Sequence, residues 1–254
     1  MNSITFLGTG TSGGVPMIGC DCPVCKSTDY KDKRLRTSAY IEYEGLKLVI
    51  DAGPDFRQQM LREGIKDFDA VLLTHKHKDH TGGLDDLRSI NYFQKKNMPI
   101  YCEQMVLSSL KLEYSYAFSE DRYPGAPRFD VHLIEDKPFS INGVEIVPLR
   151  VLHYKMPIFG YKFGRLAYIT DASFMPQETR ELLQDIDLLV INSIHHKPHI
   201  SHFCLSQAIE ESRKTSAKKT YLTHFSHQIG FNRVLEETLP DGILPAYDGL
   251  KLTF

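Results

Sequence analysis

The stretch Val71-Leu72-Leu73-Thr74-His75-Lys76-His77-Lys78-Asp79-His80 places four metal-binding side chains directly after an apolar run that is typical of a strand. In an extended chain, residues i and i+2 point to the same side, so His75 and His77 can offer ring nitrogens to one ion. Asp79 and His80 follow at once, and the glycines of Thr81–Leu84 allow a sharp turn that aims both side chains at a second ion. A solvated polar loop would not explain why imidazoles alternate at the end of a strand. The stretch therefore predicts a pair of metal ions.

Two ions need more ligands than this stretch contains, and the other candidates stand where further predicted strands end. Asp171 follows Ala167–Thr170, His153 follows Val147–Leu152, and His224 follows Tyr221–Thr223. Sheet ends are where such folds place their chemistry, so we expect these side chains to complete the site. A carboxylate such as Asp171 can bridge two cations, and a hydroxide between them, with its pKa brought to about 7, is the expected nucleophile.

Asp51 closes the run Val49-Ile50-Asp51 and has two interpretations that the sequence leaves open. It can orient a ligand imidazole through the ring N–H that is not needed for the metal. It can equally be a turn or helix cap.

Three cysteines lie within six positions at Cys20, Cys22 and Cys25, in a chain with five cysteines in all. This segment, Gly19–Cys25, is called the cysteine hook below. Its spacing is too tight for ordinary disulfides, but it suits three thiolates on zinc. The fourth ligand is left open among His227, Cys204 and Cys102. A closed tetrahedral shell leaves no position for a substrate, so the predicted zinc is structural.

Four histidines crowd the segment after Leu189–Asn192, at His195, His196, His199 and His202. Not all of them can be ligands. His202 lies just ahead of a predicted helix and can donate a hydrogen bond or a proton to a charged oxygen of the substrate. The other three are interpreted as exposed polar residues, and the sequence assigns them no function.

The strand and helix pattern predicts an α/β fold of two packed, mainly antiparallel or mixed sheets with outer helices, in a single domain over residues 1–254. Glu44-Gly45 and Asn142-Gly143 are hairpin signals, since both pairs suit a turn with positive φ. Helices are predicted over Pro54–Arg62, ending at Gly64, and over Ser206–Arg213. Strands are predicted at Ser3–Leu7, Ser38–Tyr43, Leu46–Asp51, Ala70–Thr74, Val144–Val151, Gly160–Phe163, Leu166–Thr170, Leu188–Asn192 and Lys219–Thr223.

Composition narrows the class of partner. The chain has 254 residues, of which 42% are hydrophobic, and its formal net charge is −2, from 30 basic and 32 acidic residues. This balance disfavours a polyanion such as duplex DNA but permits a small anionic substrate. The sequence shows no signal peptide and no run of 18 apolar residues, so we expect a cytoplasmic protein without a membrane partner. A homodimer is compatible with the sequence.

The middle of the chain, Arg88–Asp136, is rich in aromatic residues and contains a loop-like Tyr123-Pro124-Gly125-Ala126-Pro127. The favoured interpretation is an element that covers the core with its aromatic rings packed inward. The alternative is a lid that sets specificity over the active site.

Taken together, these residues resemble the metallo-β-lactamase superfamily, through His75-x-His77-x-Asp79-His80, His153, Asp171 and His224 in the expected order. The implied fold is an αββα sandwich. More narrowly, the chain is similar to the PhnP-type cyclic phosphodiesterases associated with carbon-phosphorus lyase. That resemblance rests on Gly8-Thr9-Gly10-Thr11-Ser12-Gly13-Gly14-Val15-Pro16, the cysteine hook, and Leu222-Thr223-His224-Phe225-Ser226-His227-Gln228.

The resemblance implies a role for each of these residues. The first active-site metal would take His75, His77, His153 and Asp171, the second would take Asp79, His80, Asp171 and His224, and both would be manganese or zinc. His227 would complete a structural zinc site with Cys20, Cys22 and Cys25. His202 would assist at the phosphate, and catalysis is expected to depend on His202 and Asp79. The implied reaction is hydrolysis of a small cyclic ribose or nucleotide-like phosphodiester.

Two alternatives stand beside this function. Endonucleases that process tRNA 3′ ends share the glycine-rich start and the dinuclear ligands, but the near-neutral charge and the cysteine hook favour a small phosphodiester over RNA. A zinc-stabilised binding protein with a vestigial site is disfavoured, since a site freed from catalysis is expected to lose at least one ligand.

Overall fold

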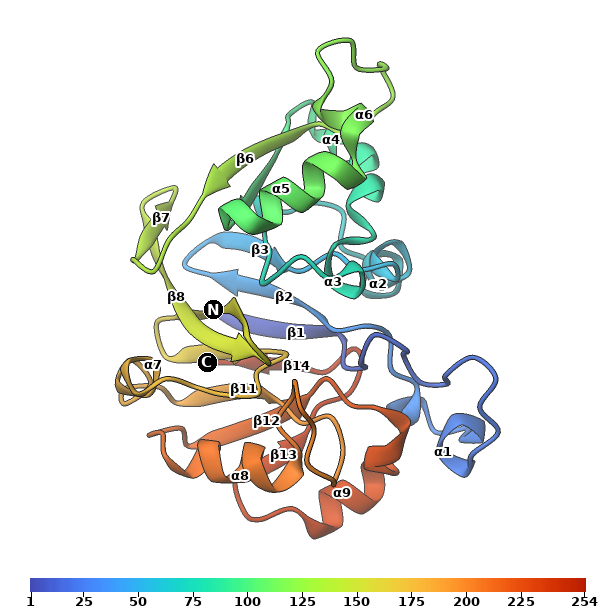
Figure 1. Ribbon diagram of the computed structural model, residues 1–254, viewed down its shortest axis with the longest axis vertical. Helices are drawn as coiled ribbons and strands as arrows, with labels where there is room; N and C mark the ends of the chain where they lie inside the picture. The colour runs from blue at the N-terminus through green and yellow to red at the C-terminus, as the bar shows by residue number, and fades with distance from the viewer.

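The computed structural model describes residues 1–254, and its elements form four layers (Figure 1). Two seven-stranded sheets face each other in the middle. Helices of the first half of the chain cover the outer face of one sheet, at the top of the figure, and helices of the second half cover the other, at the bottom. The two chain ends lie close together between these halves. The predicted αββα arrangement is confirmed.

The first sheet has the order β14-β1-β2-β3-β4-β5-β6. Strands β14 to β3 pair antiparallel, whereas β3 to β6 pair parallel. The bounds are β1 Ser3–Gly8, β2 Ser38–Tyr43, β3 Leu46–Ile50, β4 Ala70–Leu72, β5 Met98–Cys102, β6 Phe129–Leu133 and β14 Lys251–Thr253.

The second sheet repeats this division in the order β13-β12-β11-β10-β9-β8-β7. Strands β7 to β10 pair antiparallel and β10 to β13 pair parallel. The sheets are therefore mixed: tight hairpins join the antiparallel pairs β2–β3, β7–β8, β8–β9 and β9–β10, whereas helices lie between the consecutive parallel strands. The bounds are β7 Phe139–Ile141, β8 Val144–His153, β9 Met156–Phe163, β10 Leu166–Ile169, β11 Leu188–Asn192, β12 Lys219–Thr223 and β13 Ile243–Pro245.

The helices are short, and the longest is α5 with ten residues. No helix is both long and apolar enough to cross a membrane. The α-helices are α1 Pro23–Lys26, α2 Phe56–Glu63, α3 Lys78–Thr81, α4 Leu87–Gln94, α5 Gln104–Glu113, α6 Ser115–Phe118, α7 Gln177–Glu181, α8 Leu205–Arg213 and α9 Asn232–Thr238. Three 3₁₀ turns are η1 Tyr30–Asp32, η2 Leu84–Asp86 and η3 His227–Ile229.

Apolar residues fill three interfaces because the strands are buried on both faces. In β3, Leu48 and Ile50 face the core between the sheets, and Val49 faces the helices outside. In β11, Val190 faces the same central core, and Ile191 faces the outer helices of the second half. This period of two fixes the register of each strand, since a slip by one residue would exchange the two faces.

The local turn predictions are confirmed. Glu44-Gly45 joins β2 to β3 and Asn142-Gly143 joins β7 to β8, and all four residues have positive φ, from 49° to 87°. Helix α2 ends at Gly64 with φ 64°. These turns need only local backbone chemistry, which explains why the sequence predicts them well.

The segment Arg88–Asp136 supplies strands β5 and β6 of the first sheet and helices α5 and α6, which lie between them in the chain. The Tyr114 ring lies in the core between this sheet and its helices, and its hydroxyl donates to the Thr81 carbonyl at 2.7 Å. Lys78 pairs with Glu113 at 2.8 Å. Tyr114 thus packs inward as predicted and supports helix α3, whereas Tyr92, Phe93 and Tyr123 are exposed, so the predicted inward packing holds for only part of the segment.

Candidate active site

The predicted ligands leave the ends of four strands at one edge of the sandwich. His75 follows β4, His153 is the last residue of β8, Asp171 follows β10, and His224 follows β12. Asp51, which follows β3, has φ 60°, as does Asp171, and His224 has φ 59°. A left-handed backbone is strained for residues with a Cβ, and such strain gathers where side chains are held for function.

The ligand atoms converge in small groups whose members all lie within 4.8 Å of one another. Asp171 belongs to three of these groups, so its carboxylate lies at the centre of the cluster. The groups are His75, His77 and His153; His75, His80 and Asp171; His153, Asp171 and His202; and Asp79, Asp171 and His224. The structure thus brings together all seven residues predicted for the dinuclear site.

Hydrogen bonds orient the rings of His75 and His80. The Nδ1–H of His75 faces the Thr74 hydroxyl at 2.9 Å, and the Nδ1–H of His80 faces the Asp51 carboxylate at 2.6 Å. With Nδ1 protonated in each ring, Nε2 carries the free electron pair and points into the cluster.

His153 and His224 are held in the same way. His153 donates from Nδ1 to the Ser201 carbonyl at 2.7 Å, and Nδ1 of His224 lies 3.1 Å from the Thr37 hydroxyl, which itself donates to the Gly10 carbonyl. The sequence interpretation missed Thr37 and Thr74 as supports. Thr74 carries a signal, since it immediately precedes His75. Thr37 does not, because only the fold brings it to His224.

The charges of the cluster fit two divalent cations. Nε2 of His80 is buried without a hydrogen bond, 3.3 Å from both the Asp79 and the Asp171 carboxylates. Burial opposes ionisation of Asp171, but the neighbouring His224 and His80 hold its pKa well below its usual range. The buried carboxylate of Asp171, the half-buried carboxylate of Asp79 and the imidazole nitrogens around them form a donor set for zinc or manganese.

Asp51 contacts the cluster through the ring of His80, whose orientation it holds. Its Oδ1 accepts the Thr74 backbone N–H, and its Oδ2 accepts from the Thr74 hydroxyl and from Nδ1 of His80. Of the two interpretations open from sequence, the geometry fits the one in which Asp51 orients a ligand.

Replacing Asp51 by asparagine should therefore weaken metal binding about 10- to 100-fold, because the amide cannot accept from all three donors. Metal titration of the purified variant measures this loss. Asp67→Asn is the matched control, since Asp67 pairs with Lys47 at an exposed position. Equal affinities for the Asp51 variant and the unchanged chain would contradict the orienting role.

The turn after His80 differs from the expectation of a sharp glycine turn. Lys78–Thr81 forms one turn of helix, and Gly82 and Gly83 have ordinary negative φ. Glycine is needed here for close approach: a Cβ on Gly83 would lie 2.0 Å from the Gly53 carbonyl oxygen, and one on Gly53 would lie 2.0 Å from that of Asp79. The two glycines let the loop after β3 pack directly against the segment that carries His75 to His80.

The cysteine hook meets His227 as the family resemblance implies. Nδ1 of His227 lies 3.2 Å from Cys20 Sγ and 3.3 Å from Cys22 Sγ, and Cys25 completes the group within 4.8 Å. The backbone N–H of Cys25 and the ring of His227 lower the pKa of Cys22 to about 6, so this thiol is ready to bind a metal as thiolate at neutral pH.

The other two candidates for the fourth zinc ligand lie elsewhere. Cys204 caps the N-terminus of α8, and Cys102 is buried at the end of β5. His227 is therefore the candidate that reaches the cysteine hook.

His202 lies between two predicted ligands, as its proposed role requires. Its ring centre is 4.7 Å from that of His153 and 4.9 Å from that of His224, and its Nδ1 is 3.7 Å from Asp171. Burial lowers the pKa of His202 to about 3, against the opposing effect of Asp171. The ring is therefore neutral at neutral pH and has one N–H that can be donated.

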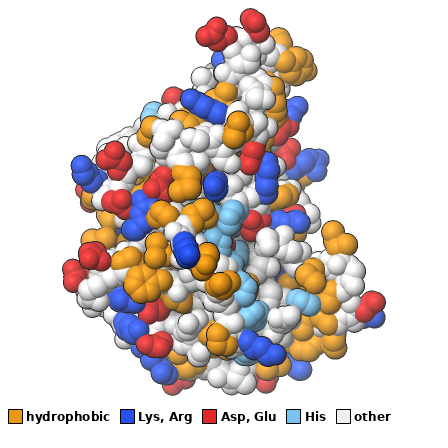
Figure 2. Space-filling model, in the orientation of Figure 1, with side chains coloured by type: hydrophobic (Ala, Val, Ile, Leu, Met, Phe, Trp, Pro, Cys, Tyr) orange, Lys and Arg blue, Asp and Glu red, His pale blue; other side chains and the backbone are white.

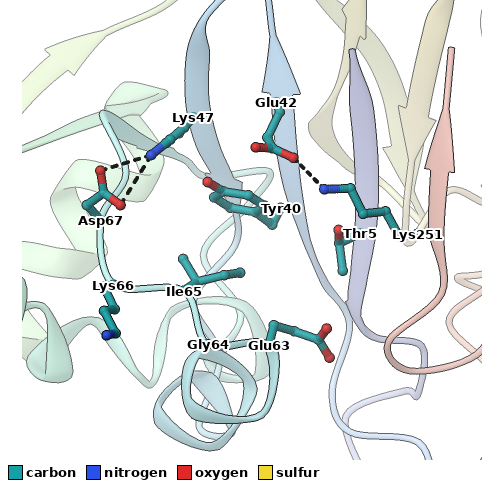
Figure 3. A pocket seen from close by; sticks show the side chains of 10 residues that line it. All are labelled: Thr5, Tyr40, Glu42, Lys47, Glu63, Gly64, Ile65, Lys66, Asp67 and Lys251. Atoms are coloured by element: carbon teal, nitrogen blue, oxygen red, sulfur yellow. Dashed lines mark hydrogen bonds and ion pairs between the residues drawn. The ribbon is translucent and has the colours of Figure 1, made fainter. Parts of the chain in front are cut away.

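A cavity of about 370 Å³ on the outer face of the first sheet contains none of these residues (Figure 3). Two of the lysines in its walls already have partners: Lys47 pairs with Asp67, and Lys251 pairs with Glu42. The candidate metal ligands and His202 lie at the strand ends instead, outside this cavity.

Comparison with known proteins agrees with this geometry. Residues 47–225 match the beta-lactamase superfamily domain. A crystal structure described as a new diphosphatase from the PhnP family is 39% identical, with a TM-score of 0.93, and the match covers 100% of this chain and 98% of that one. The chain belongs to the PhnP family of the metallo-β-lactamase superfamily.

Two curated relatives share parts of this PhnP-family chain. An octanoyltransferase of Porphyromonas gingivalis is 43% identical over 249 residues, covering 97% of this chain and 50% of that protein. The chain thus spans half the length of that relative. Ribonuclease Z of Borrelia duttonii is 25% identical over 299 residues, covering 86% of this chain and 91% of that protein.

Proposed function

We propose that this chain is a dinuclear metal-dependent phosphodiesterase that hydrolyses a small cyclic ribose or nucleotide-like phosphodiester. The observation that carries the proposal is the shared carboxylate: Asp171 lies within 4.8 Å of ligand atoms from both halves of the cluster, and His202 stands beside it. Two divalent ions held there would neutralise charge on phosphoryl oxygens and make a water molecule acidic enough to be a nucleophile.

The chain's own residues have separate tasks in this proposal. His75, His77 and His153 would hold one ion, Asp79, His80 and His224 the other, and Asp171 both. His202 is neutral, so it would donate an N–H hydrogen bond to a phosphoryl or leaving oxygen rather than transfer a proton as imidazolium. Asp51 would keep His80 in its ligand orientation.

The family relatives support hydrolysis at phosphorus. The PhnP-family neighbour is described as a diphosphatase, and the Borrelia relative is a ribonuclease. Both names describe cleavage of a phosphorus–oxygen bond. The octanoyltransferase has as much chain outside the matched region as inside it, and we propose no acyl transfer for this chain.

RNA processing is the second candidate, favoured by the ribonuclease Z relative. The charge balance favours the first, because 30 basic and 32 acidic residues give no net attraction for the phosphates of an RNA. Assaying cyclic ribose phosphates, cyclic nucleotides and a tRNA precursor side by side distinguishes the two.

The chain should hydrolyse bis(p-nitrophenyl) phosphate when manganese or zinc is supplied. His202→Ala is expected to keep its metal content and to lose about 100-fold in kcat, because one donor to the developing charge is removed. Release of p-nitrophenol and metal analysis on the same preparation measure both quantities.

His132→Ala is the matched control, since the His132 ring stacks on Tyr101, away from the cluster. Loss of the ions from His202→Ala would contradict its catalytic role and make it a ligand. A second variant, Asp79→Ala, tests the reaction itself: rates equal to those of the unchanged chain would rule out the proposed phosphodiesterase centre.

A further inference from the structure

Tyr154 occupies a turn position that normally belongs to glycine. Four hairpins of the chain have two-residue turns, and three of these turns contain glycine: Glu44-Gly45, Asn142-Gly143 and Gly164-Arg165. The fourth, Tyr154-Lys155 between β8 and β9, contains none. Tyr154 has φ 56°, close to the 54° of Gly164, and this backbone is strained for a residue with a Cβ. Strain of this kind gathers where a side chain serves a function, so the phenol ring needs an explanation beyond the turn.

The turn lies beside the metal cluster and is fixed there by its backbone. Tyr154 directly follows the ligand His153, the last residue of β8. Its backbone N–H donates to the Ser173 hydroxyl at 2.9 Å, and that hydroxyl donates to the Leu152 carbonyl at 3.0 Å. Ser173 lies two residues after the ligand Asp171. The position of Tyr154 is thus set by segments that carry metal ligands, and its phenol hydroxyl takes no part in these bonds.

Two other exposed apolar side chains lie on segments that contact the same strand end. The backbone of Phe174 pairs with that of Leu152, with nitrogen–oxygen distances of 2.9 and 3.3 Å. Ile200 precedes Ser201, whose carbonyl accepts from the ligand ring at the end of β8. Tyr154, Phe174 and Ile200 are called the apolar rim below, and their exposed fractions are 50%, 50% and 71%. Figure 2 shows hydrophobic side chains beside the histidines in the middle of the displayed face.

The chemistry of the apolar rim suits an aromatic anion. A single exposed apolar residue is ordinary, but three around one strand end of a candidate active site mark a binding surface. Lys155 Nζ lies 5.3 Å from the centre of the Tyr154 ring, and the Arg180 guanidinium lies 5.9 Å from that of Phe174. A cation over one face of a ring leaves the other face for a planar partner. The two cations also add positive charge beside the rim, which favours an anionic ligand.

We propose that the apolar rim binds the nucleobase of the substrate, with the base stacked on the ring of Tyr154, so that nucleotide esters are preferred over ribose esters without a base. This inference rests on the proposed function and narrows its substrate class. A nucleobase suits the rim because every base has a planar π-face that stacks on tyrosine. The phosphate would lie at the metal cluster, beside His153, and the base at the next residue along the chain.

Titration of the metal-loaded protein with AMP and with ribose 5-phosphate tests the rim, because the two ligands differ in the adenine. The Kd of ribose 5-phosphate divided by the Kd of AMP is called the base ratio. Stacking on one aromatic ring should give a base ratio of about ten or more, and Tyr154→Leu should lower it about tenfold. Tyr154→Phe keeps the ring and should keep the base ratio within about twofold. Tyr92→Leu is the matched control, since Tyr92 is an exposed tyrosine on the outer helix α4.

A further variant, Tyr154→Gly, separates the ring from the turn. Glycine suits this backbone, as Gly164 shows, so Tm should not fall, whereas the base ratio should fall as in Tyr154→Leu. A lower Tm with an unchanged base ratio would make Tyr154 a residue of the fold and overturn the nucleobase site. Size-exclusion chromatography of Tyr154→Leu tests the rim as a contact between two copies of the chain. A changed oligomeric state with an unchanged base ratio would assign the rim to that contact instead.

The base ratio also keeps this inference distinguishable from the proposed function. A ratio near one in the unchanged chain, or equal losses for both ligands in Tyr154→Leu, overturns the nucleobase site even if cyclic phosphodiesters are hydrolysed. A selective loss for AMP supports the site even if no ester is turned over, in which case only the proposed reaction fails. If 2′,3′-cyclic AMP is hydrolysed, Tyr154→Leu should raise its KM about tenfold and change kcat less than about twofold, because the stacked base lies away from the reacting atoms. A loss of kcat at unchanged KM would contradict the stacking role.

Discussion

Asp171→Asn is expected to lower turnover of bis(p-nitrophenyl) phosphate by about 1000-fold or more and to reduce the metal content. The Asp171 carboxylate belongs to three of the four ligand groups of the cluster, so its loss affects both candidate ions. Each factor of ten in rate corresponds to about 1.4 kcal/mol, and metal stabilisation of a phosphoryl transition state supplies several kcal/mol. Asparagine keeps the volume of the buried side chain, so a folding defect is not the expected cause.

Metal analysis and circular dichroism on the same samples separate loss of ions from loss of fold. Asp187→Asn is the matched control, because Asp187 lies directly before β11 of the same sheet and pairs with Arg165 and Lys218 outside the cluster. If Asp171→Asn kept its full metal complement and rate, Asp171 would not be a bridging ligand.

The site was more predictable than the sheet that holds it. His75 to His80 lie in one short stretch, so their shared direction follows from local geometry. His153, Asp171 and His224 are far apart in sequence, but each follows an apolar run, and the common position of strand ends is enough to bring them together. These residues could therefore be predicted as metal ligands without knowing the order of the strands.

Strands β5, β6, β7, β13 and β14 were not predicted from the sequence. Strand β5 contains Pro99, which argues against a strand, whereas β6 does alternate apolar and polar residues over Phe129–Leu133, a short signal that the sequence interpretation missed. Both are edge or near-edge strands that form by parallel pairing, which depends on distant partners rather than local pattern.

The groups that orient the ligand imidazoles by hydrogen bonds could not be predicted from the sequence either, apart from Asp51 and Thr74. The Ser201 carbonyl and the Thr37 hydroxyl orient His153 and His224, yet a backbone carbonyl has no sequence signal, and threonines are common at strand starts. Only the folded chain shows which of them lie next to a ring nitrogen.

Cys22→Ser is expected to remove one zinc ion per chain and to lower Tm by roughly 10 °C. A ligand present at 1000 times its Kd stabilises a fold by about 4 kcal/mol, and for a domain of this size 1 kcal/mol corresponds to about 2–4 °C. Zinc content and thermal unfolding measure the two effects. Cys204→Ser is the control, because Cys204 is a helix N-cap and serine is a good N-cap residue. Unchanged zinc stoichiometry in Cys22→Ser would contradict a structural zinc in the cysteine hook.

The same variant should retain most of its phosphodiesterase activity, because His224 is held by contacts that do not pass through the cysteine hook. Buried Arg34 donates to the Ser226 carbonyl at 3.2 Å and to the Gly230 carbonyl at 3.0 Å. The Phe225 backbone N–H donates to Thr9 at 2.8 Å. These bonds fix the chain on the C-terminal side of His224 without zinc. Loss of stability with retained kcat would therefore distinguish the structural ion from the catalytic pair. Loss of an ion that takes part in the reaction would instead lower kcat directly.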